Sequence, residues 1–270
     1  MNGYVMVVDA HCVEGAIATA NSINRNAKAS ICFFDVGMNE QQVKILEKLG
    51  NVVKVERTIT TPHIKVPGLE KSYACLDSTQ SGFDNIIYLQ YDMLVLEDIR
   101  HLFEDVEEHF IMATKASNYN LLTNPSWERP LSHYLLPGIT CFNPNFSCMN
   151  GGFFVITKDN LLILREGMEK YEEYFPKFHA VDQNLLNILL DLKGLQWTEL
   201  PYEYNATKAH WRLYESICKF EVSVNFNKAQ INDREVKVLH FHGWPQKPWT
   251  HPSWFREGVV KLWKFYRYID

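Results

Sequence analysis

Short apolar runs alternate with amphipathic segments along the first third of the chain, and this order restricts the fold more than any other feature. Runs typical of strands cover Tyr4–Val8, Ile31–Val36, Val52–Val55 and Asn85–Leu89. Helical spacing covers Gly15–Ile23, and a second helix is predicted from the capping residue Asn39 to Gly50, where a C′ glycine would stand. The alternation favours an α/β sandwich with a mixed, mainly parallel sheet flanked by helices.

Two carboxylates follow strands of this predicted sheet. Asp9 comes after the first strand, and Asp92 comes shortly after the fourth. Ligands of such sheets bind beyond the carboxyl ends of the strands. The position makes both residues candidates for one site, although an Asp at a strand end is common and assigns no function by itself.

The rest of the chain predicts further elements. These are a strand at Gly152–Thr157, a helix capped by Asp159, a helix at Val181–Leu192, a strand at Val236–Phe241 and a helix from Trp254 to Tyr268. The segment Ser117–Met149 is polar, aromatic and interrupted by prolines. We expect it to be a loop region over the site, because long irregular segments inside a domain are often functional.

The length and composition limit the class of protein. A chain of 270 residues fits one domain over 1–270 that ends in a helical tail at about 251–270. The formal net charge of −5 argues against nucleic acid as a partner. The six cysteines are scattered without Cys-x-x-Cys spacing, which disfavours zinc and fits free thiols in a reducing compartment.

The two ends of the chain bear on location. The N-terminal residues have no signal-peptide pattern, and no apolar run has the length of a membrane span, so a cytoplasmic location is expected. The tail is amphipathic, with apolar residues at helical spacing against lysine and arginine. Such a helix makes peripheral contact with a membrane surface, or it packs on the domain or on a partner; packing is the favoured interpretation.

Four segments carry residues with chemistry of their own. They are Gln90-Tyr91-Asp92, Asn150-Gly151-Gly152, Val181-Asp182-Gln183, and His240-Phe241-His242-Gly243 with Lys247-Pro248-Trp249. Together they resemble glycosyltransferase family 8, the glycogenin and bacterial galactosyltransferase group, from Val5 to Trp249. The resemblance implies the GT-A fold, a Rossmann-like α/β arrangement, and transfer of a sugar from a nucleotide-sugar donor.

This resemblance implies a metal site. Gln90 and Asp92 stand at the two carboxylate positions of the family's Asp-x-Asp motif, with Tyr91 between them, and His240 completes the set. Mn²⁺ or Mg²⁺ would neutralise the leaving nucleoside diphosphate. Gln90 offers only a neutral oxygen, so the metal requirement stays open. Without its flanking motif, His240 would be interpreted as a core histidine, and His242 is close enough to be a rival ligand.

The resemblance also assigns contacts to the nucleotide. Lys247 corresponds to the family lysine on the diphosphate, where a cation stabilises the leaving phosphate. Its spacing from Gly243 is one residue longer here than in the family pattern. Lys71 stands at a second basic donor-contacting position, and a plainer interpretation is a solvated lysine. Val8 and Asp9 stand where the family holds uracil and ribose, and only Asp9 has the same type of side chain as in the family.

Three residues are implied to handle the donor sugar and its transfer. Asn150 corresponds to the asparagine that meets the sugar, and Gly151 and Gly152 would allow close backbone approach, unless they are only a strand irregularity. Asp182 would hold sugar hydroxyls, and either Asp182 or Gln183 would face the anomeric carbon. The plainer role of Asp182 is to cap the helix that starts there.

Three functions remain open at this point. The first is a retaining transferase that moves a hexose or pentose from a UDP-sugar to a hydroxyl of a glycan or other acceptor. The second is a nucleotide-sugar or glycan-binding protein with weak or no catalysis, which Gln90 suggests. The third is a metal-independent transferase of the same fold. His179 replaces a family Asp and suggests a different sugar or acceptor. Asn205-Ala206-Thr207 matches a glycosylation sequon, interpreted as accidental.

Overall fold

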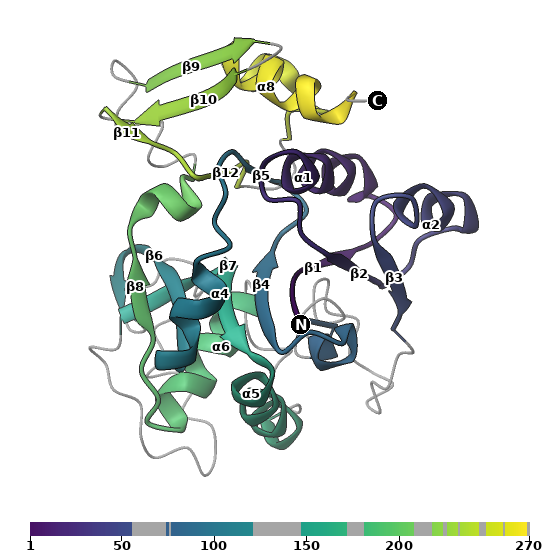
Figure 1. Ribbon diagram of the computed structural model, residues 1–270. Coiled ribbons are helices and arrows are strands. Elements are labelled where there is room, and N and C mark those ends of the chain that lie inside the picture. Colours follow the sequence, from purple (N-terminus) through teal and green to yellow (C-terminus); the bar gives the residue numbers. More distant parts are fainter. Residues whose placement is uncertain are drawn as a thin grey trace.

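The computed structural model describes the backbone of residues 1–55, 74–75, 77–120, 147–171, 181–207, 218–223, 226–231, 233–242, 247–255 and 257–268. Within these ranges, seven strands form one sheet in the order β3-β2-β1-β4-β7-β6-β8 (Figure 1). They span Asn2–Val8 (β1), Ile31–Asp35 (β2), Asn51–Lys54 (β3), Asn85–Leu89 (β4), Ile111–Asn120 (β6), Ser147–Thr157 (β7) and Thr198–Leu200 (β8).

The sheet is mixed and mainly parallel, as predicted. The strands β3, β2, β1 and β4 run parallel to one another, and β8 is parallel to β6. Only β7 is antiparallel to its neighbours, β4 and β6. The carboxyl ends of β1 and β4 therefore lie next to each other, which places the chain after β1 beside the chain after β4.

Helices cover both faces of this sheet, and successive side chains of each strand point to opposite faces. Tyr4, Met6 and Val8 of β1 share one apolar cluster with α1 (Val13–Asn26), α2 (Glu40–Leu46) and α4 (Leu102–Asp105). Val5 and Val7 belong to a second cluster with α5 (Lys158–Tyr171) and α6 (Val181–Leu192). The central strands β1, β2 and β4 are almost wholly buried and mostly apolar because they contribute to both cores. Short 3₁₀ helices occur at Asp77–Ser81, Val106–Glu108, Tyr202–Asn205 (η5) and Pro252–Trp254.

Two smaller sheets were not predicted. One is an antiparallel pair of three-residue strands, β5 (Met93–Val95) and β12 (Val238–His240). The other consists of β9 (Cys218–Ser223), β10 (Phe226–Ile231) and β11 (Arg234–Glu235). The predicted strand at Val236–Phe241 corresponds to β12 and is shorter than expected.

The C-terminal helix α8 (Glu257–Arg267) packs on α1, beside β9 and β10 (Figure 1). Its buried apolar residues share a cluster with Ala18 of α1. The Asn21 side chain donates to the Tyr266 carbonyl oxygen over 2.8 Å, and Arg267 forms an ion pair with Glu14. The apolar face of the helix is thus used inside the fold, and peripheral membrane contact stays a prediction. Among the described residues, no helix is both long and apolar enough to cross a bilayer.

One predicted helix end is wrong. Asn39 caps α2 as expected, in a reciprocal capping box with Gln42, but the helix ends at Leu46 rather than near Gly50. A Cβ at Gly50 would stand 2.6 Å from the Ile31 carbonyl oxygen. Close packing against β2 therefore requires a glycine at this position, and its N–H also donates to the carbonyl oxygen of Leu46, the last helical residue, over 3.0 Å.

Other boundaries also differ from prediction. Because α5 begins at Lys158, its cap is Thr157, whose hydroxyl oxygen accepts from the Asn160 N–H over 3.3 Å; Asp159 lies inside the first turn. The loop predicted at Ser117–Met149 is wrong at both ends, since β6 and β7 extend into it. Residues 121–146 lie outside the described residues.

Candidate active site

The short ladder between β5 and β12 brings Asp92 and His240 together. Asp92 immediately precedes β5, and His240 is the last residue of β12, where it pairs with Met93. The ladder continues one step further, because the Phe241 N–H donates to the Asp92 carbonyl oxygen over 2.8 Å. Three-residue strands thus place a carboxylate beside an imidazole that is far away in sequence.

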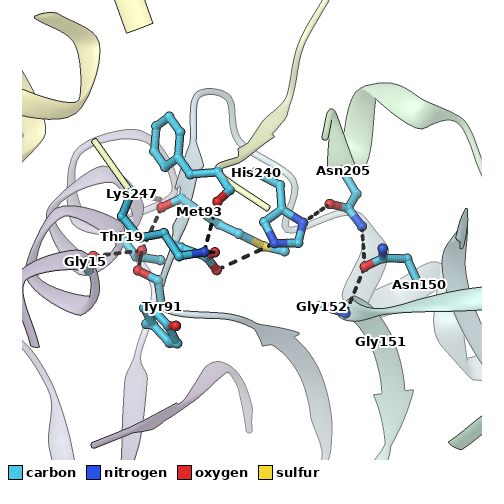
Figure 2. A network of polar contacts seen from close by, with 12 residues as sticks. Gly15, Thr19, Tyr91, Met93, Asn150, Gly151, Gly152, Asn205, His240 and Lys247 are labelled. Carbon is cyan, nitrogen blue, oxygen red and sulfur yellow. Dashed lines mark hydrogen bonds and ion pairs between the residues drawn. The ribbon is translucent and has the colours of Figure 1, made fainter. Parts of the chain in front are cut away.

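Helix α1 supports the turn that carries Asp92. The Thr19 hydroxyl lies 2.9 Å from the Tyr91 carbonyl oxygen and 2.6 Å from that of Met93 (Figure 2). Gly15 permits this approach, since a Cβ there would stand 2.5 Å from the Tyr91 carbonyl oxygen. The backbone on both sides of Asp92 is therefore held by the same helix.

Lys247 forms a buried ion pair with Asp92. Its ammonium group donates to Asp92 Oδ2 and, over 3.0 Å, to the Phe241 carbonyl oxygen. Burial alone would raise the pKa of Asp92, but the Lys247 ammonium and then His240 outweigh it and hold that pKa well below its usual range. Asp92 is therefore ionised at neutral pH, and the two residues that the sequence assigned to one site are in contact.

The second oxygen of Asp92 faces His240. Asp92 Oδ1 lies 3.5 Å from His240 Nε2, and within the described part of the chain neither atom has a hydrogen-bond partner. On the other side of the ring, His240 Nδ1 lies 2.8 Å from Asn205 Oδ1 (Figure 2). Buried polar atoms without partners are rare in folded proteins, so these two atoms are candidates for contact with a ligand.

The other wall of the site is β7. The Gly152 N–H donates to Asn150 Oδ1 over 2.9 Å, and the same oxygen accepts from Asn205 Nδ2 over 3.0 Å. A Cβ at Gly152 would stand 2.7 Å from His240 Cε1 and 2.9 Å from Gln90 Oε1. Gln90 and His240 therefore border β7 at the same point, and that point requires a glycine.

The start of α6 lies against Gly151. A Cβ on Gly151 would stand 2.8 Å from the Cα atom of Gln183, and Gln183 Oε1 accepts from the Gly151 N–H over 3.3 Å. Asn187 fixes the helix further, since its amide hydrogen-bonds both backbone groups of Met149 over 2.8 and 2.9 Å. Asp182 lies in the first turn of α6 rather than at the capping position, because the helix begins one residue earlier.

Three of the other predicted nucleotide residues, Val8, Asp9 and Tyr91, lie at the same edge of the sheet. Asp9 directly follows β1, and its carboxylate accepts from the N–H two residues later over 2.9 Å. The Val8 side chain is fully buried in the core, so only its backbone is at the edge. The Tyr91 ring centroid lies 5.8 Å from Lys247 Nζ. Lys71 and Gly243 fall outside the described residues.

Two residues of this network, Thr19 and Asn205, were not predicted as site residues. Thr19 follows Gly15 by four residues on one face of α1, and such a pair of small residues signals a close backbone approach. At Asn205, the only sequence feature that drew attention was the glycosylation sequon. Because Asn205 is 1% exposed, it is no glycosylation acceptor in the folded protein.

The described residues at the site are suited to bind a divalent cation, but they do not form a preorganised set of metal ligands. In the described ranges, no three or more His, Cys, Asp or Glu side chains are grouped so as to hold a metal ion, because Gln90 stands in place of a carboxylate. The two partnerless atoms are nevertheless a carboxylate oxygen and an imidazole nitrogen, donor types that Mn²⁺ accepts. Gln90 Oε1 borders the same glycine as His240, and it offers a neutral third oxygen.

Known proteins share this fold. The Glycosyl transferase family 8 model matches residues 4–252. An active-site mutant of LgtC has a TM-score of 0.69 and 15% identity, with 98% of this chain and 95% of that chain covered. LgtC in complex with donor and acceptor sugar analogues has a TM-score of 0.63 and 17% identity, with 99% of this chain and 95% of that chain covered. Mouse xyloside xylosyltransferase 1 has a TM-score of 0.55 and 15% identity, with 90% of this chain and 98% of that chain covered. No curated protein sequence matches significantly.

At these identities the solved structures show the fold, which is the GT-A arrangement of a mainly parallel sheet between helices. The family model adds the sequence evidence over almost the whole chain, including each of the four segments singled out above. The chain belongs to glycosyltransferase family 8.

Proposed function

We propose that this protein transfers a sugar from a UDP-sugar to an acceptor hydroxyl and retains the anomeric configuration. One observation carries the proposal: the charged groups of Asp92 and Lys247 meet His240 at the carboxyl end of β4. This is the edge where open α/β sheets bind ligands. Membership of the family supports the transferase class, and the donor and stereochemistry are what that family leads us to expect.

The charge balance of the site favours a divalent cation as part of the donor complex. Asp92 and Lys247 neutralise each other, and Gln90 is uncharged, so these side chains leave no net positive charge for a doubly negative diphosphate. We propose that Mn²⁺ or Mg²⁺ is held by Asp92 Oδ1, His240 Nε2 and the Gln90 amide oxygen. When bound, the cation supplies Lewis-acid stabilisation of the leaving diphosphate.

Lys247 is suited to hold the diphosphate. An ammonium group has three N–H donors, and among the described residues two of them are directed to Asp92 and Phe241. The third is available to a phosphate oxygen. A cation fixed in place before the donor arrives stabilises charge as it builds on the leaving group, without reorganisation at that moment.

The sugar is assigned to the wall formed by β7 and α6. Asn150 and Gln183 lie on either side of the two glycines, and Asp182 is adjacent to Gln183 in the first turn of α6. In the proposed mechanism these side chains hold the sugar hydroxyls, with Asp182 or Gln183 toward the anomeric carbon. Positioning donor and acceptor then accounts for much of the rate.

A metal-independent transferase is the second candidate. The observation that favours it is the Lys247 ammonium, which already satisfies one oxygen of Asp92 inside the protein. In that case the lysine alone would meet the diphosphate. A protein that binds a nucleotide-sugar without transfer is the third candidate, and it rests on Gln90 in place of a carboxylate.

Thermal unfolding separates these candidates. We would record the unfolding midpoint with UDP-sugars, GDP-mannose and a CMP-sugar, each with Mn²⁺ and with EDTA. A ligand at about 100 times its dissociation constant adds roughly 2.7 kcal/mol, which shifts the midpoint visibly. A UDP-sugar shift that EDTA abolishes supports the metal-dependent site, and one that survives EDTA supports the second candidate. Slow UDP release from donor alone would show retained chemistry. No shift with any nucleotide would contradict the proposal.

A further inference from the structure

Asn205 connects β7 to the candidate metal ligand His240. It is the last residue of η5, and its position is fixed by the next residue, Ala206, which forms a bridge with Leu239 of β12. The Ala206 N–H donates to the Val238 carbonyl oxygen over 2.9 Å, and the His240 N–H donates to the Ala206 carbonyl oxygen over 3.1 Å. The backbone thus holds Asn205 beside the imidazole.

A backbone donor fixes the orientation of both amides in this network. The Gly152 N–H can only donate, so the Asn150 atom it reaches over 2.9 Å is the carbonyl oxygen. The Asn205 atom 3.0 Å from that oxygen must therefore be the NH₂ group, which also donates to Thr114 Oγ1 over 2.9 Å. The remaining amide atom, Asn205 Oδ1, faces His240 Nδ1 at 2.8 Å.

The orientation of Asn205 determines which nitrogen of His240 carries the proton. Because Asn205 Oδ1 is an acceptor, Nδ1 must be the N–H nitrogen of the ring. In the neutral imidazole, Nε2 then presents a lone pair toward Asp92 Oδ1, 3.5 Å away. Two buried acceptors that face each other call for a positive species between them. Metal-bound histidines show this same pattern, with the second ring nitrogen donating to a protein oxygen.

We propose that Asn205 is a positioning residue that fixes the Nδ1–H tautomer of His240 and so directs the Nε2 lone pair into the site. Its use for metal binding rests on the function proposed above, whereas the tautomer does not. Asn205 touches neither donor nor acceptor sugar in this scheme; it acts through His240.

The matched variants are Asn205→Leu, Asn205→Asp and Thr114→Val. The leucine is close in shape and removes every polar contact. The aspartate keeps an acceptor toward Nδ1, but it replaces the NH₂ donor by a second carboxylate oxygen and adds a negative charge. The Thr114→Val variant removes a buried hydrogen bond of Asn205 and leaves the contact with His240 in place. Circular dichroism and thermal unfolding would confirm that each variant is folded.

The first measurement is the ring ¹⁵N spectrum of metal-free protein, with His240→Gln used to assign the signal. We expect Nδ1–H in the wild type, in Asn205→Asp and in Thr114→Val, and loss of that preference in Asn205→Leu. An Nε2–H wild type would overturn the proposal, even if the leucine variant fails to fold. So would a leucine variant that keeps the wild-type tautomer.

The second measurement is the binding of Mn²⁺ alone, followed by electron paramagnetic resonance. We expect Asn205→Leu to weaken it roughly 10- to 100-fold, the range seen for outer-shell partners of metal ligands. Asn205→Asp, which keeps an acceptor on Nδ1, and Thr114→Val should not weaken it. Equal affinity in all four proteins would overturn the link to metal binding. If the wild type holds the predicted tautomer but binds neither Mn²⁺ nor UDP-sugars, the proposed function fails and the tautomer assignment stands.

Discussion

The ammonium group of Lys247 is ion-paired with the carboxylate of Asp92, 155 residues earlier in the chain. Both side chains are almost completely buried, with exposed fractions of 8% and 3%. Each group therefore depends on the other for its counter-charge. The pair links the end of β4 to the segment after β12, so it serves the stability of the fold as well as the proposed donor site.

Removing one partner of this pair should be costly. Lys247→Met leaves the Asp92 carboxylate buried without its counter-ion, and such losses cost about 3–5 kcal/mol. Urea denaturation measures the change. The double variant Asp92→Asn/Lys247→Met should recover much of the loss. The control is Lys237→Met, which breaks the more exposed pair with Glu97 and should cost below about 1 kcal/mol. Equal losses for the two single variants would contradict this account.

The same pair predicts how stability depends on pH. Because the pKa of Asp92 is depressed in the folded protein, its contribution is fully present above the unfolded value of about 3.9 and is lost as the pH falls below it. The denaturation midpoint of the wild type should therefore fall more steeply between about pH 5 and pH 2 than that of the Asp92→Asn/Lys247→Met double variant. Parallel curves would show that Asp92 does not contribute.

Restoring a carboxylate at position 90 should strengthen metal binding. In Gln90→Asp, a second hard ligand lies beside His240, so Mn²⁺ should bind more tightly without donor, on the order of tenfold or more. The midpoint of unfolding should respond to Mn²⁺ more strongly than in the wild type. Gln80→Glu adds the same charge at an exposed position before the amino end of β4, at the opposite end of that strand from Asp92, and should leave the Mn²⁺ response unchanged. An unaltered affinity in Gln90→Asp would place the metal elsewhere.

Gly152 should not tolerate a side chain. In Gly152→Ala, the new Cβ meets His240 and Gln90 at less than 3 Å, and overpacking of this kind costs roughly 1–3 kcal/mol. Gly167→Ala is the matched control, because its nearest neighbour is the flexible end of Lys193 and alanine favours a helix. Chemical denaturation of both variants decides the matter, and equal stability would show that β7 can shift away from the site.

Asp182 is expected to act in transfer rather than in nucleotide binding. Asp182→Asn keeps the shape and removes the charge, so it should lose most of the transfer rate while UDP binding stays near the wild-type level. Product formation and thermal shift measure the two quantities separately. Asp159→Asn makes the same change in the first turn of α5 and should leave both unchanged. A transfer rate near wild type in Asp182→Asn would remove Asp182 from the proposed mechanism.

Local patterns predicted the elements that form from local interactions. The strand Asn85–Leu89 and the helix Val181–Leu192 have the predicted boundaries, because an unbroken apolar run and a strong amphipathic period each determine one kind of structure. Asn39 was predicted to cap α2 for the same reason: its partner, Gln42, lies three residues away. Family resemblance then grouped Asp92, His240 and Lys247, which the fold brings into contact.

The missed features depend on residues that are distant in sequence. The ladder of β5 with β12 has three residues on each side, too few for a periodic signal, and its partners pair across most of the chain. Asn205 could not be recognised without that ladder, since its role arises from the bridge between Ala206 and Leu239. Gly50 was interpreted from its own helix alone, whereas the contact that requires a glycine there is with the neighbouring strand β2.

The ladder of β5 with β12 also determines when the site forms during translation. A nascent chain that has reached β7 already contains Asp92 and Asn150, but His240 and Lys247 are synthesised much later. Contacts between such distant residues form only after a long loop has closed. The proposed donor site can therefore form only after the chain has been synthesised past Lys247, and a chain terminated before that residue would carry Asp92 without the lysine that balances it.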